Sequence, residues 1–123
     1  MRRTEIFMKI KDIVSVLDAE ILCGEDHLEN EVHSACGADM MSDVLAFVKE
    51  QAVLLTGLIN PQVIRTAEMM DMRCIVFVRG KTPPEEVVEL AKETGIVLLA
   101  SKERMYPACG KLYATGLSGG GTV

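Results

Sequence analysis

The stretch AVLLTGLINPQVIRTAEMMDMRCIVFVRG, residues 52–80, decides the fold of this chain. Two continuous apolar runs, AVLLTG (52–57) and CIVFVRG (74–80), enclose a segment, 61–71, whose apolar residues recur at helical spacing. Strands that are apolar at every position are covered on both faces, as in a parallel sheet flanked by helices. The stretch therefore predicts a strand, a helix and a second, parallel strand joined by a right-handed crossover.

The same unit occurs again directly downstream. A helical segment at 83–94 leads to a third apolar run, IVLLAS, at 96–101. In both units the strand is followed by a glycine, a short loop with proline, and a helix. The apolar positions of the two helices align: Val63, Ile64 and Ala67 with Val87, Val88 and Ala91. We expect one compact α/β domain over residues 8–117, with a largely parallel sheet flanked by helices and loose termini at 1–7 and 118–123.

The first third of the chain is less regular. Residues 9–17 have the spacing of a short amphipathic helix, and residues 19–24 and 31–37 have the pattern of strands that end at glycine. A loop at 38–43 leads into a helix with an apolar face made by Val44, Leu45 and Val48, and Asp39 or Ser42 could cap it. The pattern leaves open whether these elements join the main sheet or form a separate layer. A last segment, 101–117, is expected to be partly helical, with Pro107 starting, kinking or ending it.

Composition excludes several classes of protein. The chain has 123 residues, of which 49% are apolar, and a net charge of −5, which argues against a general nucleic-acid binder. It contains no apolar run near the ~20 residues of a membrane span, and its N-terminal residues are too polar for a signal peptide. The four cysteines have no metal-binding or redox spacing, so we expect buried free thiols in the cytoplasm.

The turns after the apolar strands are the candidate site. The carboxyl ends of parallel strands meet at one edge of a sheet, where ligands bind in open α/β folds, and helix N-termini there attract anions. Asn60-Pro61 fits the start of one helix, and Thr82 with Glu85 fits a capping box for the next. The residues that could bind a nucleotide or phosphorylated metabolite are Thr56, Gly57, Asn60, Arg79, Gly80 and Lys81, with Asp39 and Ser42 nearby.

Simple structural roles compete with that interpretation. The turn TGLINP (56–61) lacks the spacing of a P-loop and of a dinucleotide-binding motif. Glu85 and Glu86 would compete with an anion for the second helix N-terminus. The only histidines, His27 and His33, form no catalytic or metal-ligand pattern. We therefore predict no catalytic residue, no metal site and no cofactor other than a possible nucleotide.

Five segments together resemble the DRTGG domain family in its small stand-alone form: ADMMSDVLA, LLTGLINPQVIRTAEM, VFVRGK, IVLLAS and ACGKLYATGL. The resemblance covers about residues 8–117. It implies a fold similar to the N-terminal domains of HPr kinase/phosphorylase and certain Mur ligases, often dimeric, without the kinase's catalytic domain. The chain departs from the family at its name motif, with Ile59-Asn60 in place of Asp-Arg and Val78-Arg79-Gly80 in place of Thr-Gly-Gly.

Three functions follow as hypotheses. The first is a non-enzymatic regulatory or ligand-sensing domain that acts as a homodimer, since the chain is small and shows no catalytic pattern. The second is a binding site for a nucleotide or phosphometabolite at the carboxyl ends of the strands. The third, implied by the labels of some family members, is an iron–sulfur or hydrogenase-associated protein, although cysteine spacings of 13, 38 and 35 residues match no cluster motif.

Overall fold

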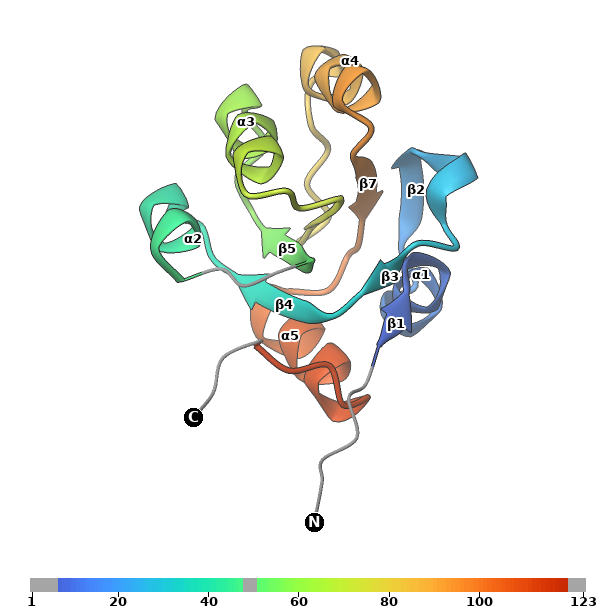
Figure 1. Ribbon diagram of the computed structural model, residues 1–123. Coiled ribbons are helices and arrows are strands. Elements are labelled where there is room, and N and C mark those ends of the chain that lie inside the picture. Colours follow the sequence, from blue (N-terminus) through green and yellow to red (C-terminus); the bar gives the residue numbers. More distant parts are fainter. Residues whose placement is uncertain (1–6, 48–50, 120–123) are drawn as a thin grey trace.

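The computed structural model describes residues 7–47 and 51–119 (Figure 1). Its main sheet has five strands in the order β2-β7-β6-β5-β4. The four strands β4 (Ser34–Gly37), β5 (Ala52–Thr56), β6 (Cys74–Phe77) and β7 (Val97–Ala100) are parallel, and β2 (Glu20–Cys23) runs antiparallel to β7 at the edge. The predicted α/β fold with a largely parallel sheet is confirmed. The two N-terminal strands that were left open join this sheet, one at each edge.

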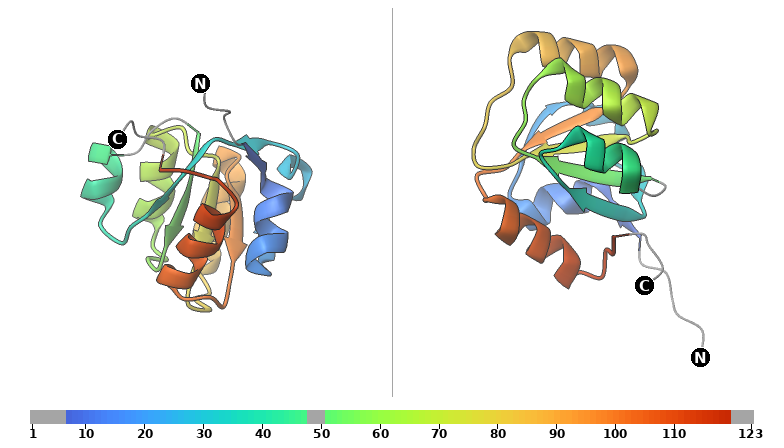
Figure 2. Two further views of the ribbon diagram at one scale, coloured as in Figure 1. Left: turned by 90° about the horizontal axis from the view of Figure 1, so that it is seen from below. Right: turned by 90° about the vertical axis from the view of Figure 1, so that its left-hand side faces the viewer.

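Helices cover both faces of the sheet. The helices α2 (Met41–Phe47), α3 (Pro61–Met69) and α4 (Glu85–Thr94) connect successive parallel strands and lie on one face, while α1 (Ile10–Leu17) and α5 (Met105–Ala114) lie on the other (Figures 1 and 2). The three crossovers step along the sheet in the same direction. Because crossovers share one hand, successive connections in one direction place their helices on the same side.

The two faces of the sheet form two apolar clusters. Along β5, Val53 and Leu55 belong to the cluster under α1 and α5, while Leu54 belongs to the cluster under α2, α3 and α4. All three side chains are fully buried, as the continuous apolar run requires. Burying one such side chain stabilises the fold by about 1.5–3 kcal/mol, so these clusters supply most of the favourable free energy of folding.

The predicted strand 31–37 is two strands. Glu31–Val32 is β3, which pairs with β1 (Met8–Lys9) in a separate two-stranded sheet, and the chain then passes through His33 into β4. The prediction of one strand was wrong because the two halves pair with different partners. His33 stacks on Phe7, with ring centroids 3.8 Å apart.

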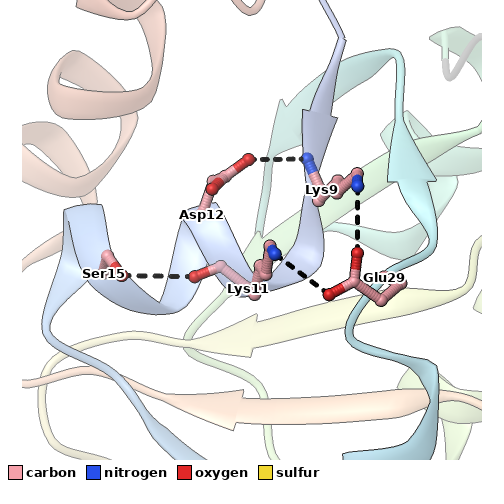
Figure 3. A network of polar contacts seen from close by, with 5 residues as sticks. All are labelled: Lys9, Lys11, Asp12, Ser15 and Glu29. Carbon is pink, nitrogen blue, oxygen red and sulfur yellow. Dashed lines mark hydrogen bonds and ion pairs between the residues drawn. The ribbon is translucent and has the colours of Figure 1, made fainter.

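The start of α1 is held by a polar network (Figure 3). Glu29 accepts hydrogen bonds from the ammonium groups of Lys9 and Lys11 at 2.9 and 3.0 Å, and the Asp12 carboxylate accepts the backbone N–H of Lys9 at 3.1 Å. The hydrogen bond from Lys9 is the main reason that the pKa of Glu29 is lowered, and the same bond raises the pKa of Lys9. These charges lie at the end of α1 remote from the carboxyl ends of the parallel strands.

Other local predictions need correction. Leu45 was expected on the apolar face of α2 but is 46% exposed. Val44, which was expected on the same face, is fully buried. Val48 lies outside the described residues. The capping box of Thr82 and Glu85 does not form, because α4 begins at Glu85 and Pro84 occupies the N-cap position. Pro107 lies in the first turn of α5, where a missing N–H costs no helical hydrogen bond.

Candidate functional site

The loops that follow the four parallel strands lie along one edge of the sheet, which we call the carboxyl rim. Two backbone hydrogen bonds continue the sheet there: Ala38 N–H donates to the Leu55 carbonyl at 3.0 Å, and Val78 N–H donates to the Thr56 carbonyl at 3.0 Å. The rim therefore consists of loops 38–40, 57–60, 78–84 and 101–104. Parallel strands place the loop residues next to one another although they are far apart in sequence.

Asp39 ties the first two loops together. Its Oδ1 accepts the backbone N–H of Gly57 at 2.7 Å and the hydroxyl of Thr56 at 3.2 Å. The Thr56 hydroxyl, which is fully buried, also accepts the N–H of Leu58 at 3.1 Å. The donors at this turn are thus directed at a carboxylate of the protein itself, and a negative charge already occupies the position that an anion would take.

The Arg79 side chain lies across Gly57. A Cβ built on Gly57 would be 2.6 Å from Nη2 of Arg79, so any larger residue would displace the guanidinium from this position. Arg79 has φ 65°, in the left-handed region that few residues other than glycine adopt. Its side chain forms no hydrogen bond or ion pair with the residues that the structure describes. Backbone strain next to an unpaired cation is typical of functional positions.

The loops after β6 and β7 leave the sheet in opposite directions. The first leads to α4 on one face and the second to α5 on the other (Figure 2). At their base they are joined by two backbone hydrogen bonds, from Arg79 N–H to the Glu103 carbonyl at 2.7 Å and from Gly80 N–H to the Ser101 carbonyl at 2.9 Å. Neighbouring strands whose connections diverge in this way create the crevice in which open α/β proteins bind ligands.

A pocket of about 520 Å³ lies at this divergence. Its walls come from three segments: the turn between α1 and β2, the loop after β6 and the loop after β7. The lining residues are Leu17, Asp18, Glu20, Gly80, Lys81, Thr82, Ala100, Ser101, Lys102 and Glu103. The volume falls in the range of small-molecule sites, about 300–1,000 Å³.

The Ser101 hydroxyl holds one wall of the pocket in place. It donates to the Leu17 carbonyl at 2.9 Å and accepts the N–H of Glu103 at 3.2 Å, and its side chain is buried. The carboxylate of Glu103 pairs with Lys111 on α5. Two cations remain, Lys81 and Lys102, and within the described part of the chain neither ammonium group has a hydrogen bond or ion pair.

The predicted site residues fall into two groups along the rim. Asp39, Thr56, Gly57 and Arg79 meet around the loop after β5, while Gly80 and Lys81 line the pocket. Asn60 occupies the N-cap position of α3, without a capping side-chain hydrogen bond, and Ser42 is an exposed residue inside α2. Within residues 7–47 and 51–119, no side-chain hydrogen bond links either of these two to the other predicted residues.

Sequence reasoning missed most of the pocket wall, because only Gly80 and Lys81 among its lining residues were predicted site residues. Asp18, Glu20, Ser101 and Lys102 line it, but Asp18 caps the end of α1 and Glu20 begins β2, whose place in the sheet the sequence left open. A signal for the other two was present, because Ser101 and Lys102 follow an apolar strand as Arg79 and Gly80 do. Treating all the strand ends alike would have found them.

The four cysteines are free thiols; Cys36 and Cys109 interact, but no three of them gather at one point. Cys23 and Cys74 are buried in different apolar clusters, and Cys36 and Cys109 are half-buried. Burial raises the pKa of all four thiols, most strongly for Cys74. Among the residues that the structure describes, no group of three His, Cys, Asp or Glu side chains could hold a metal ion. No helix in the same residues is long and apolar enough to cross a bilayer.

Comparisons with known proteins bear on the whole fold. A search of curated proteins found no match. Among solved structures, the crystal structure of the CBS and DRTGG domains of the regulatory region of Clostridium perfringens pyrophosphatase, complexed with the activator diadenosine tetraphosphate, is similar with a TM-score of 0.71. The identity is 19%, over 91% of this chain and 48% of that chain, so this chain spans about half the length of that regulatory region. The family model of the DRTGG domain matches residues 12–114, most of the sequence, and the chain therefore belongs to the DRTGG domain family.

Proposed function

We propose that this chain is a regulatory domain that senses a nucleotide or another phosphorylated metabolite, that it works as a homodimer and that it catalyses no reaction. The observation that carries the proposal is the pocket of about 520 Å³ at the diverging loops, lined by two lysines without an ion-pair partner in the described residues. The C. perfringens region of similar fold is regulatory and was crystallised with a nucleotide activator, which supports a regulatory role here.

The charges around the pocket favour a phosphate group. Lys81 and Lys102 stand on different loops that line the same pocket, so both contribute positive charge to an anion bound there. The neighbouring helix α5 has no acidic residue in its first turn and follows Arg104, whereas α4 begins with Glu85 and Glu86. Because free N–H groups and the positive end of the dipole attract anions, the α5 side of the pocket is the better place for a phosphate.

The remaining wall suits the neutral part of a nucleotide. Asp18 and Glu20 are exposed carboxylates that accept hydrogen bonds from ribose hydroxyls or from an exocyclic amino group. Such a wall would repel a second phosphate close to it. A ligand with one anionic end and one hydroxyl- or amine-bearing end therefore matches the pocket better than inorganic phosphate alone.

A role without catalysis is supported by where the candidate catalytic groups lie. His27 is in the short 3₁₀ helix 25–27 after β2, and His33 lies between β3 and β4; neither lines the pocket. The half-buried and buried thiols have raised pKa values, which keep them in the poorly nucleophilic protonated form. Free thiols also fit a reducing compartment, and we place the protein in the cytoplasm.

Titration calorimetry with a panel of adenine and uridine nucleotides, diadenosine tetraphosphate and inorganic phosphate tests the proposal. We expect saturable binding of at least one nucleotide, weaker binding of phosphate, and a loss of about tenfold or more in affinity for Lys81→Ala and for Lys102→Ala. Lys92→Ala is the matched control, because this substitution removes the same charge at a position outside the pocket. Lys92 pairs with Glu89 on α4. The absence of binding heat with every compound at millimolar concentration would contradict a nucleotide site. An equal loss of affinity in Lys92→Ala would show that the lysine substitutions act only through the net charge of the protein.

A further inference from the structure

Helix α5 presents two tyrosines to solvent in one line. Tyr106 is 88% exposed and Tyr113 is 73% exposed. Residues seven apart in an α-helix are separated by almost two full turns, about 10 Å along the axis, and point in nearly the same direction. Gly110 lies between them on the same side, and a Cβ built there would meet nothing within 4 Å. The helix surface is therefore flat and open between two projecting rings.

The exposed side of α5 is uncharged except at one margin, where Lys111 lies. Tyr106, Pro107, Gly110, Tyr113 and Ala114 are all exposed and together form what we call the tyrosine stripe. The opposite side of the helix, with Ala108 and Leu112, is buried against the sheet. The one charged residue in α5, Lys111, is paired with Glu103. A helix with apolar residues nearly all round is normally covered on both sides, and α5 is covered by the described chain on one side only (Figure 2).

We propose that the tyrosine stripe is the surface through which two copies of this chain associate. The pattern of large, small and large residues is nearly symmetric, because the midpoint between Tyr106 and Tyr113 falls next to Gly110. In an antiparallel pair of α5 helices related by a two-fold axis, each Tyr106 lies beside the other copy's Tyr113, and glycine faces glycine, so the helix axes can approach closely. A surface that is complementary to itself is what a two-fold interface requires. The absence of unpaired charge on the stripe matters because the chain carries a net charge of −5, which otherwise opposes self-association.

The area of the stripe is consistent with this occupant. A tyrosine buries about 150–250 Å², so the four tyrosines of a pair bury about 600–1,000 Å². A stable specific interface buries about 1,200–2,000 Å² in total. The tyrosines thus provide about half of the interface, and the backbone at Gly110 with Pro107 and Ala114 must provide contact for the rest. Closing the gap at Gly110 should therefore prevent the pairing.

The stripe is directly connected to the pocket. Lys102 and Glu103 line the pocket, and the next residue, Arg104, is the N-cap of α5. A ligand that contacts this loop also sets the position of the first turn of α5, which carries Tyr106. This link rests on the proposed nucleotide site, while the pairing itself does not. If both hold, nucleotide changes the dimer dissociation constant, and dimerisation changes nucleotide affinity by the same factor.

The oligomeric state of the full chain, measured without nucleotide by sedimentation equilibrium and light scattering, tests the pairing. We expect a reversible dimer for the wild type, and monomers for Gly110→Gln and Tyr106→Lys. Gly110→Gln faces open space and replaces glycine with a better helix former, so its unfolding temperature should equal or exceed that of the wild type. Met69→Lys is the matched control, because Met69 is also 73% exposed but lies on α3 across the sheet; it should remain dimeric.

A wild type that stays monomeric up to hundreds of micromolar would overturn the pairing, and so would a Gly110→Gln protein that dimerises as tightly as the wild type. Dissociation by Met69→Lys but not by Tyr106→Lys would place the interface on the other face and also overturn it. Calorimetry on monomeric Gly110→Gln separates the two proposals. Nucleotide binding by this monomer would support the pocket independently of the tyrosine stripe. A wild-type dimer that binds no nucleotide would support the tyrosine stripe alone.

Discussion

Gly37 marks a close approach between α5 and the sheet. A Cβ added there would lie 2.6 Å from Sγ of Cys109 and 3.2 Å from Sδ of Met105. The Cys109 sulfur can move away only by a change of its χ1 rotamer or by a shift of the helix. Glycine at the last residue of β4 therefore leaves room for the Cys109 and Met105 side chains of α5 in their present positions.

Gly37→Ala should lower the free energy of unfolding by about 1–3 kcal/mol, the usual cost of overpacking. Urea denaturation measures this change. Cys109→Ala removes the clashing sulfur, so the double variant should be less destabilised than the sum of the two single variants. Strict additivity of the two changes would show that the clash at Cys109 is not the cause.

Arg79 has a strained backbone and a side chain without a partner in the described residues. The backbone strain affects stability, and the free guanidinium affects binding. Arg79→Gly relieves the left-handed backbone at φ 65°, while glycine adds entropy to the unfolded chain. We expect stability to be unchanged or higher by up to about 1 kcal/mol, and nucleotide affinity to fall only modestly, because Arg79 does not line the pocket but directly precedes Gly80, which does. Asp71→Gly is the control, with φ 56° at the far end of α3; it should leave affinity unchanged. If Arg79→Gly bound nucleotide with the affinity of the wild type, the guanidinium would have no role in binding.

The contacts of individual side chains were only partly predictable from the sequence. The pairing of Thr56 and Gly57 with Asp39 depends on strands that bring residues 17 and 18 positions apart into contact. The sequence marks each residue as part of a turn, and the sheet order decides which turns touch. The same reason explains why Ser101 and Lys102 were missed although their positions after an apolar strand were visible.

At the scale of elements, Ser101 connects β7, the end of α1 and the loop that leads to α5. Ser101→Ala removes the bonds to the Leu17 carbonyl and the Glu103 N–H at a buried position. We expect a loss of about 1–3 kcal/mol in the free energy of unfolding, because both partners lose a hydrogen bond. Ser15→Ala removes an exposed hydroxyl with a 3.4 Å bond and should change stability by less than about 0.5 kcal/mol. Equal effects of the two substitutions would contradict the role of Ser101.

The parallel strands and their helices followed directly from sequence because two-sided burial leaves a signal at every residue. Ala52–Thr56 and Cys74–Phe77 are buried along their whole length, and the apolar runs show this. The edge elements lacked such a signal. Glu31–Val32 and Ser34–Gly37 look like one strand, since only tertiary pairing divides them.

At the scale of the whole molecule, the four thiols make stability depend on alkaline pH. Burial raises their pKa values above the ordinary thiol value of 9.0. Between the unfolded and the folded pKa, the unfolded chain has lost protons that the native state still holds, so stability falls as pH rises. The contribution of the neutral thiols is fully present below about pH 9 and declines above it. For the fully buried Cys74 the decline is up to about 1.4 kcal/mol per pH unit.

Urea unfolding at pH 7.5, 9 and 10 should therefore show a falling midpoint. Cys74→Ala is less stable at every pH, because it opens a cavity, but its midpoint should fall less steeply than that of the wild type. A slope that is unchanged in Cys74→Ala would mean that other groups cause the alkaline loss.

The global arrangement also explains why function was harder to predict than fold. A pocket made by three segments, from residues 17–20, 80–82 and 100–103, has no contiguous motif. The fold is set by many apolar residues acting together, whereas the site is set by which loops diverge at one place on the rim. Sequence located the rim, and the structure located the pocket on it.

The most direct test of a ligand site at the diverging loops is a backbone amide NMR titration with the tightest-binding nucleotide found by calorimetry. The account predicts saturable shifts centred on residues 17–20, 80–82 and 100–103, with smaller changes along α5. Saturable shifts centred instead on the amino ends of the strands, or no saturable shift with any nucleotide of the panel, would contradict it.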